Sequence, residues 1–156
     1  MAGGVASGLA VAMALGSASA AGSGKDAVLA ANASFYTALN TMFTGNAAPM
    51  GDVWSHADDA TYMGPDGKFL HGWSAIGENW KVQAGLKLGG HVDPVEIQAV
   101  AGEDLGVVSD YEEGENTNAA GKVAKVRLRA TNVFRLEGGT WKMVAHHTDT
   151  LPYLAK

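Results

Sequence analysis

The chain has no cysteine among its 156 residues and only four prolines. The missing cysteines exclude disulfides, a thiol nucleophile and thiolate-bound metals. Basic residues are scarce, because 11 lysines and arginines stand against 16 aspartates and glutamates, for a net charge of -5. No cluster of basic side chains exists, so we expect no nucleic-acid surface. What is present is 47% hydrophobic residues, enough for the core of one domain.

The first residues are small and apolar. Residues 5–21 carry no charge, and Ala18-Ser19-Ala20 has the small-x-small form of a signal-peptidase site. No lysine or arginine precedes Lys25, so the basic start of a signal peptide is missing. We expect a signal peptide over residues 1–20, a flexible segment over 21–25, and a periplasmic or secreted protein without membrane contact after processing. If this interpretation fails, the protein is cytoplasmic.

The pattern of the remaining residues, 26–154, predicts one domain with helices first and strands later. Apolar residues at spacings of three and four predict helices over 26–44, 50–54 and 72–89, with a short hairpin around Gly64-Pro65-Asp66-Gly67. From His91 onward the pattern has period two, which predicts four strands over the ranges 92–100, 105–113, 122–137 and 140–148. This order indicates an α+β fold, with helices covering one face of a curved antiparallel sheet.

The last two strands flank Gly138-Gly139, a dipeptide suited to a tight hairpin turn. Counting outward from this turn predicts four facing pairs on one apolar face: Leu136 with Trp141, Phe134 with Met143, Asn132 with Ala145, and Ala130 with His147. Asn132 and His147 are the only polar residues of this face, so they are the first candidates for a functional site.

Several motifs together resemble the SnoaL-like branch of the nuclear-transport-factor-2-like superfamily. The motifs are Phe35-Tyr-Thr-Ala-Leu-Asn40, Trp54-Ser-His-Ala-Asp-Asp-Ala-Thr-Tyr62, Gly64-Pro65, His71-Gly72-Trp73 with Ile76 and Trp80, and Trp141-Lys-Met-Val-Ala-His-His147. The resemblance implies a cone-shaped fold, in which three N-terminal helices pack on four long strands plus a short hairpin. It also implies a cavity lined by the apolar hairpin face.

The same resemblance implies a homodimer formed through the other face of the sheet. On that face we expect a mixed set of residues: Arg127, Arg129, Thr131, Val133, Val144 and His146.

Two relatives with known chemistry differ from this chain at their functional positions. In the ketosteroid isomerases an Asp before a Pro moves a proton, and here Gly64 stands at that place. Phe35 stands where their Tyr stands, with Tyr36 on a different helix face, and Asn132 replaces their second Asp. In the calcium/calmodulin-dependent kinase association domain, Arg residues stand at the positions of Asn132 and Thr148 and form a carboxylate pocket. Neither activity is expected here in that form.

The candidate catalytic residues are therefore His147, as a general base, and Asn132, which would orient a substrate or water. The alternative for both is a structural role in the cavity wall. Seven residues are expected to contact a ligand: Trp54, Tyr62, Trp80, His91, Tyr111, Phe134 and Met143. We expect no metal, because the sequence shows only pairs of metal ligands, and no cofactor. Glu112 is expected in a solvated strand end with Glu113 and Glu115.

Three functions remain open. The first is binding of a small, mostly apolar ligand in the cone by a homodimer. The second is an isomerase, cyclase or hydrolase that uses His147 with Asn132. The third is a module for assembly alone, which a solid cone would favour. A cavity filled by Trp54, Trp80 and Phe134 would count against an enzyme.

Overall fold

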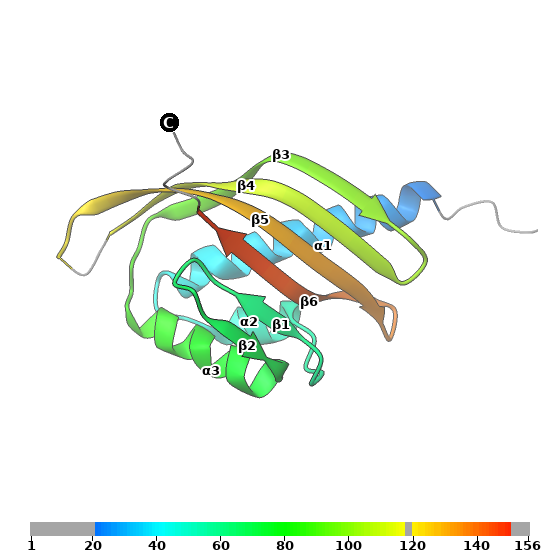
Figure 1. Ribbon diagram of the computed structural model, residues 1–156, viewed down its shortest axis with the longest axis horizontal. Coiled ribbons are helices and arrows are strands. Elements are labelled where there is room, and N and C mark those ends of the chain that lie inside the picture. The colour runs from blue at the N-terminus through cyan, green and yellow to red at the C-terminus, as the bar shows by residue number, and fades with distance from the viewer. Residues whose placement is uncertain (1–20, 118–119, 151–156) are drawn as a thin grey trace, which may run out of the picture.

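Figure 1 shows the computed structural model, which describes residues 21–117 and 120–150. Its three helices are α1 (Ala21–Met42), α2 (Ala48–Val53) and α3 (Gly72–Gly85). Its strands are β1 (Thr61–Met63), β2 (Phe69–His71), β3 (His91–Ala101), β4 (Leu105–Thr117), β5 (Val123–Glu137) and β6 (Thr140–Asp149). The expected α+β order is confirmed. Helix α1 begins at Ala21, so it includes residues 21–25, which lie outside the domain expected from the sequence. The segment expected to be a signal peptide lies outside the described residues.

The six strands form one sheet in the order β2-β1-β6-β5-β4-β3. All pairs are antiparallel except β1 with β6, which is parallel. In Figure 1 the four long strands curve in front of α1, while α2 and α3 lie beside the short hairpin of β1 and β2. We call the face that contacts the helices the inner face and the opposite one the outer face. None of the described helices is both long enough and apolar enough to cross a membrane.

Helix α1 supplies the core with one stripe of side chains. Its apolar members Val28, Phe35, Leu39 and Met42 recur at helical spacing and are at most 7% exposed. The helix ends at Met42, and Gly45, with a φ of 108°, closes the turn that follows by donating its N–H to the carbonyl of Met42 at 2.9 Å. The stripe meets Trp80 of α3 and Phe134 of β5 in a single cluster, so the helices and the inner face share one core.

The hairpin of β5 and β6 turns where the sequence predicts. Gly138 and Gly139 have φ values of 56° and 85°, as a two-residue type I′ turn requires, and they join the pair Glu137 and Thr140. The next predicted pairs, Leu136 with Trp141 and Phe134 with Met143, are also confirmed.

Beyond Met143 the predicted register is wrong. The register shifts between Phe134 and Val133, so that Phe134 pairs with Met143, Val133 pairs with Ala145, and Val144 is left as the extra residue of a β-bulge. Asn132 therefore faces His146, and Ala130 faces Thr148. Because side chains alternate along a strand, a shift of one residue exchanges the two faces.

The bulge decides which of the two neighbouring histidines enters the core. His146 is 4% exposed on the inner face, whereas the side chain of His147 is 48% exposed on the outer face. The expectations that His147 faces the cone and that His146 belongs to the outer face are both wrong.

Gly114→Ala tests the close approach of β3 and β4 on the inner face. A Cβ at Gly114 would collide with the backbone carbonyl oxygen of His91, which cannot move without breaking the sheet pairing. We expect the variant to lose about 1–3 kcal/mol of unfolding free energy, measured by urea denaturation. Gly85→Ala is the control, because a Cβ at this helix end meets nothing within 4 Å. Equal denaturation midpoints for the two variants would contradict the expected clash.

Candidate functional site

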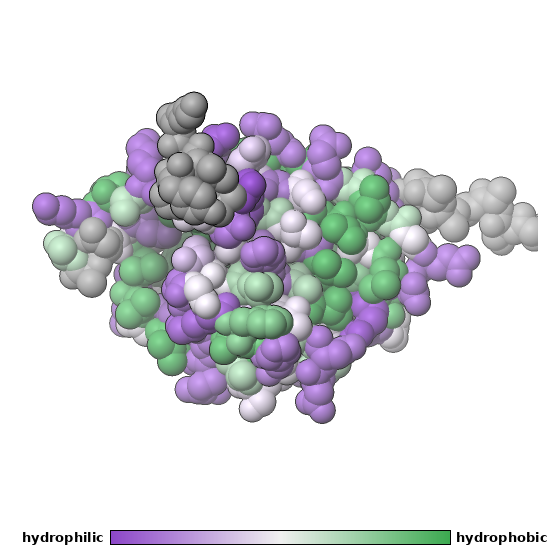
Figure 2. All heavy atoms as spheres, viewed as in Figure 1, coloured by the Kyte–Doolittle hydropathy of each residue, from purple (hydrophilic) through white to green (hydrophobic). Residues whose placement is uncertain are grey.

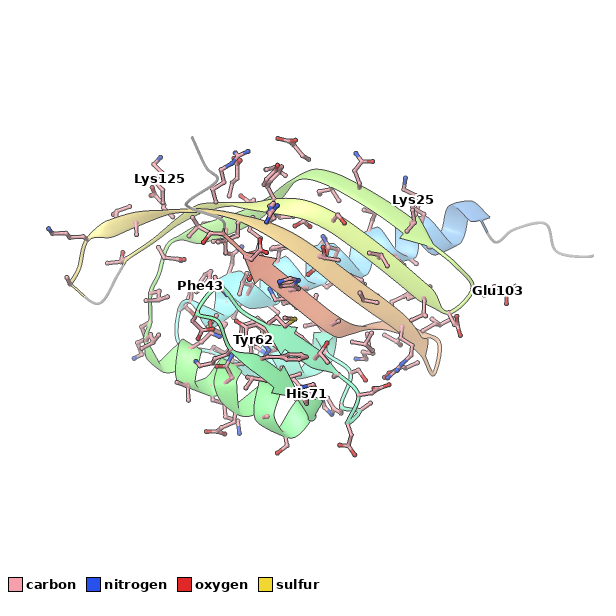
Figure 3. The ribbon with its side chains drawn as sticks, in the orientation of Figure 1. Lys25, Phe43, Tyr62, His71, Glu103 and Lys125 are labelled. Carbon is pink, nitrogen blue, oxygen red and sulfur yellow. The ribbon has the colours of Figure 1, made fainter. Side chains whose placement is uncertain are left out.

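A cavity of about 180 Å³ lies between the inner face of the sheet, the end of α1 and α3. Apolar and aromatic side chains make up most of its wall, and Phe43 and Tyr62 are labelled there in Figure 3. The lining residues are Leu39, Phe43, Tyr62, Pro65, Trp80, Gln83, Leu88, Val92, Glu112, Asn116, Val126, Leu128, His146 and Thr148. The cavity is therefore apolar with a few polar groups, as small-molecule sites are.

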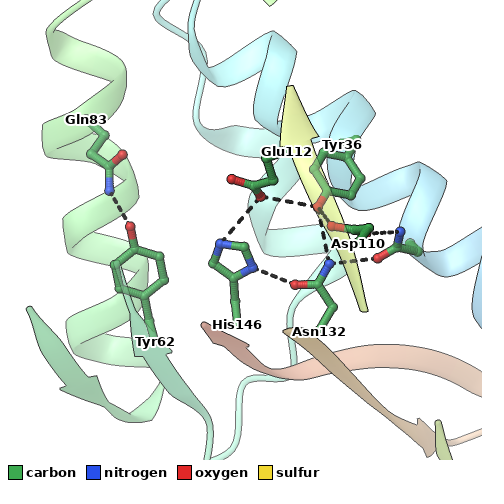
Figure 4. Close-up of polar contacts among 8 residues, drawn as sticks. Tyr36, Tyr62, Gln83, Asp110, Glu112, Asn132 and His146 are labelled. Atoms are coloured by element: carbon green, nitrogen blue, oxygen red, sulfur yellow. Dashed lines mark hydrogen bonds and ion pairs between the residues drawn. The ribbon is translucent and has the colours of Figure 1, made fainter. Parts of the chain in front are cut away.

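Glu112 of β4 and His146 of β6 form the polar part of the wall. Glu112 is 4% exposed, and its Oε1 lies 3.8 Å from Nε2 of His146 (Figure 4). Both residues stand on the inner face because Glu112 alternates with Val108 and Asp110 along β4, and His146 follows the bulge in β6. Two titratable groups thus meet at one side of an apolar cavity.

Behind this pair lies a network of buried polar side chains. The hydroxyl of Tyr36 is 2.9 Å from Oδ1 of Asp110 and 3.2 Å from Oε1 of Glu112. The amide nitrogen of Asn132 donates to Oδ1 of Asn32 at 2.8 Å and lies 3.4 Å from the Tyr36 hydroxyl. All of these residues are at most 7% exposed. The network joins α1 to three neighbouring strands.

Burial shifts the pKa of each titratable member towards its uncharged form. Desolvation, followed by the charge of Asp110, raises the pKa of Glu112 to about 7. Desolvation lowers the pKa of His146 to about 3, so its ring is neutral at neutral pH. Desolvation, then the charges of Glu112 and Asp110, raises the pKa of Tyr36, and desolvation raises that of Asp110. Glu112, with a pKa of about 7, therefore changes charge near neutrality.

The contacts of His146 fix where its single ring proton sits. Nδ1 lies 2.6 Å from Oδ1 of Asn132, and an amide oxygen only accepts hydrogen bonds. The proton is therefore on Nδ1, and Nε2 faces Glu112 and the cavity with a free lone pair.

The predicted site residues are only partly brought together. Asn132 is fully buried within the network, and Tyr62 and Trp80 line the cavity. Trp54, Phe134 and Met143 fill the core and do not line the cavity. His147 lies on the outer face, 3.9 Å from Asp149, so its expected catalytic position is wrong.

His91 and Tyr111 lie outside the cavity altogether. The exposed ring of His91 pairs with Asp93 at 2.8 Å, and Tyr111 lies on the outer face beneath the guanidinium of Arg127. Their expected role in ligand binding is therefore wrong, because both side chains point away from the cone.

Four members of the network were not expected from the sequence: Asn32, Tyr36, Asp110 and Glu112. The expectation of a solvated Glu112 is wrong because β4 continues to Thr117, so Glu112 lies in mid-strand on the inner face. The available signal was the alternation Val108, Asp110, Glu112, which places two acids on the apolar face of one strand.

Two cavity-lining residues carry polar atoms without a partner, Nε1 of Trp80 and Oγ1 of Thr148, both buried. Such atoms cost free energy unless a ligand or water meets them. Among residues 21–117 and 120–150, no three His, Asp or Glu side chains are placed to hold a metal ion.

The fold is shared with solved structures. A "putative dehydratase" of the NTF2-like family from Streptomyces avermitilis is 20% identical, with a TM-score of 0.71 over 81% of this chain and 95% of its own. A "putative calcium/calmodulin-dependent protein kinase type II association domain" from Thiobacillus denitrificans is 25% identical, with a TM-score of 0.63 over 79% and 94%. A "putative aromatic ring hydroxylase" from Novosphingobium aromaticivorans is 17% identical, with a TM-score of 0.66 over 80% and 87%.

No curated protein matches the chain. The family model of the SnoaL-like domain matches residues 28–151, which include every strand, α2, α3 and α1 from Val28 onward. The buried network and the cavity both lie within this match. The chain therefore belongs to the family of SnoaL-like domains.

Proposed function

We propose that this chain binds a small, uncharged, mostly apolar molecule in the cone and moves a proton on it. The observation that carries the proposal is Glu112, a buried carboxyl with a pKa of about 7, beside a neutral His146 at the wall of an apolar cavity. A general acid or base is most effective when its pKa is close to the working pH. Isomerisation, cyclisation and dehydration are reactions of this class.

The cavity limits the size and charge of the ligand. Its volume of about 180 Å³ is slightly above the roughly 150 Å³ of an engineered cavity that holds benzene, so a single ring fits. No lysine or arginine is among the described residues that line it, whereas Glu112 is, so an anion would not be stabilised. The unpartnered atoms of Trp80 and Thr148 favour a ligand that carries an oxygen.

The proton would move between Glu112 and the ligand. As a carboxylate, Glu112 removes a proton from a carbon beside a carbonyl, and it returns that proton to another atom of the ligand. The C–H electron pair passes to the carbonyl oxygen, and this negative charge is stabilised by a donor such as Nε1–H of Trp80. The neutral His146 offers Nε2 as an acceptor beside Glu112. This replaces the expected role of His147 with His146 and keeps Asn132 as its partner.

Two other functions are less well supported. Assembly alone would not require a cavity, and although Trp54 and Phe134 fill the core, Trp80 lines a cavity that remains open. Ligand binding without chemistry would not require a titratable carboxyl at a site where its burial is unfavourable.

The proposal includes a homodimer that forms through the outer face. Val100, Val107, Val133 and Ala145 are consecutive partners across four strands and make an apolar row. Figure 2 shows apolar side chains gathered on this face of the sheet, over the long strands. An exposed apolar row on a sheet is a common site of association. Export through residues 1–20 also remains a proposal, which rests on the sequence alone.

Glu112→Gln should raise the free energy of unfolding at pH 8. The folded pKa of about 7 lies above the ordinary value of 4.5, so between these pH values the folded protein keeps a proton that the unfolded chain has released. Stability from this group therefore falls as the pH rises through the window, and an uncharged amide removes that loss. We expect a gain of about 2–3 kcal/mol at pH 8 and little change at pH 4, measured by urea denaturation. Glu113→Gln, on the outer face, is the control and should show no gain at pH 8, because it removes a carboxylate that is ion-paired with Arg127.

Proton transfer can be measured without knowing the natural substrate. In D₂O, we expect the wild type to accelerate C–H exchange beside the carbonyl in some members of a panel of uncharged single-ring ketones and lactones. Glu112→Gln should lower this rate by about 10²–10⁴-fold, and His147→Ala, on the outer face, should leave it unchanged. Ring compounds that shift the methyl resonances of Val126 and Leu128, yet exchange no faster than in buffer, would indicate a binding domain and contradict the proposal.

Val107→Asp tests the dimer. The charge falls in the middle of the apolar row, so we expect sedimentation at micromolar concentration to change from dimer to monomer. Leu86→Asp is the control, because Leu86 is equally apolar but 60% exposed at the end of α3. A wild type that sediments only as a monomer would remove the dimer from the proposal.

A further inference from the structure

Asp110 is connected to His146 through two amide side chains, although the two residues do not touch each other. Nδ2 of Asn32 donates to Oδ2 of Asp110 at 3.3 Å, and Nδ2 of Asn132 donates to Oδ1 of Asn32 at 2.8 Å. Oδ1 of Asn132 then accepts the proton of His146 Nδ1 at 2.6 Å. Figure 4 shows this continuous series, which we call the amide relay.

The amide relay has a direction, which Asp110 determines. The amide nitrogen of Asn132 also lies 3.4 Å from the hydroxyl of Tyr36, and because this hydroxyl donates to Asp110, its oxygen accepts from Asn132 in the same direction. Each amide has one face that donates and one that accepts, so turning either amide would require the other to turn as well. Both oxygens of Asp110 accept, one from Tyr36 and one from Asn32, as a carboxylate does. An acceptor at this end obliges Asn32 to present its nitrogen to Asp110 and its oxygen to Asn132.

Glu112 does not fix which ring nitrogen of His146 carries the proton. Its Oε1 lies 3.8 Å from Nε2 of His146, which is too far for a hydrogen bond. The aromatic rings of Phe35 and Tyr62 that lie beside His146 also do not distinguish one ring nitrogen from the other. Among the described residues, Asn132 is therefore the hydrogen-bond partner of the ring, and its amide nitrogen contacts Asn32 and, at the longer distance of 3.4 Å, the hydroxyl of Tyr36.

We propose that Asp110 is a positioning residue, which fixes the tautomer of His146 through Asn32 and Asn132 and so keeps the lone pair of Nε2 turned towards Glu112 and the cavity. This inference rests on the proposed function, because it assigns a purpose to that lone pair. The opposite tautomer would point an N–H group at Glu112 and leave the site without its neutral acceptor. In serine proteases, losing the group that fixes the histidine tautomer lowers kcat by about 10⁴-fold.

The tautomer can be read directly from the ¹⁵N chemical shifts of the His146 ring in the free protein. We expect the wild type to show a protonated Nδ1 and an unprotonated Nε2. Asp110→Ala removes the acceptor behind both Asn32 and Tyr36, so the Nε2–H form should rise by about tenfold or more, although Asp110 does not touch His146. Asn32→Ala leaves Asn132 its longer contact to the Tyr36 hydroxyl, so we expect a smaller rise in the same direction. Ser34→Ala, on the exposed side of the same helix, is the control and should keep the wild-type shifts.

Asp110→Asn provides the conservative rescue. The introduced amide can turn its oxygen to Asn32 and its nitrogen to Tyr36, whose proton is then free to point to Glu112. We therefore expect the wild-type tautomer in this variant, a result that a merely structural role of Asp110 would not produce together with a change in Asp110→Ala.

Two results would overturn the proposal: an Nε2–H tautomer in the wild type, or wild-type shifts in both alanine variants. The first needs no variant, so the test holds even if the alanine variants do not fold. Because the shifts are read without any ligand, a failure here is distinct from a failure of proton exchange. A relay that operates in a protein without exchange activity would support the positioning role and contradict only the proposed reaction.

Discussion

The bulge at Val144 is the constraint on which the site depends. Strand β6 is paired on both of its edges, and on both edges the pairing skips Val144. On one edge, Met143 and Ala145 pair with Phe134 and Val133 of β5. On the other edge, the same two residues pair with Trp54 and Thr61. Met143 below the bulge and His146 above it therefore face the same cone. In a regular strand, Ala145 and His147 would form the inner wall, and the network would have no histidine.

The second constraint is the number of protons that Tyr36, Asp110 and Glu112 share. Tyr36 has one hydroxyl proton and two carboxyls within 3.2 Å, and it can donate to only one of them. Asp110, the nearer, receives it, so Glu112 must hold a proton of its own to meet the tyrosine oxygen. Among the described residues no lysine or arginine forms an ion pair with either acid. One buried negative charge is thus stabilised by hydrogen bonds alone, and after desolvation, the larger cause, this charge raises the pKa of Glu112 further.

The sequence predicts those features of the fold that depend on local residue patterns. The helix stripe through Phe35 and Leu39 and the turn at Gly138 and Gly139 follow from spacing and backbone freedom, and both were confirmed. The bulge could not be predicted in the same way, because it arises where β6 meets two partners distant in the chain. Without the bulge, the sequence predicts the wrong face of the sheet for His146. Glu112 could have been found, since it alternates with Val108 and Asp110, but a run of acids is more often solvated, and only the length of β4 shows otherwise.

The location of the polar network within the core supports a chemical role over a structural one. Along the inner side of α1, Asn32 and Tyr36 lie between apolar residues that pack well at either end, Val28 and Leu39. An apolar pair at these positions would complete the core, and replacing buried charged groups by apolar ones is often neutral or stabilising. A buried carboxyl whose pKa lies near neutrality lowers the stability of the folded protein, and the fold does not require this carboxyl. Because that carboxyl opens onto the cavity, proton transfer to a bound molecule explains the arrangement better than support of the fold.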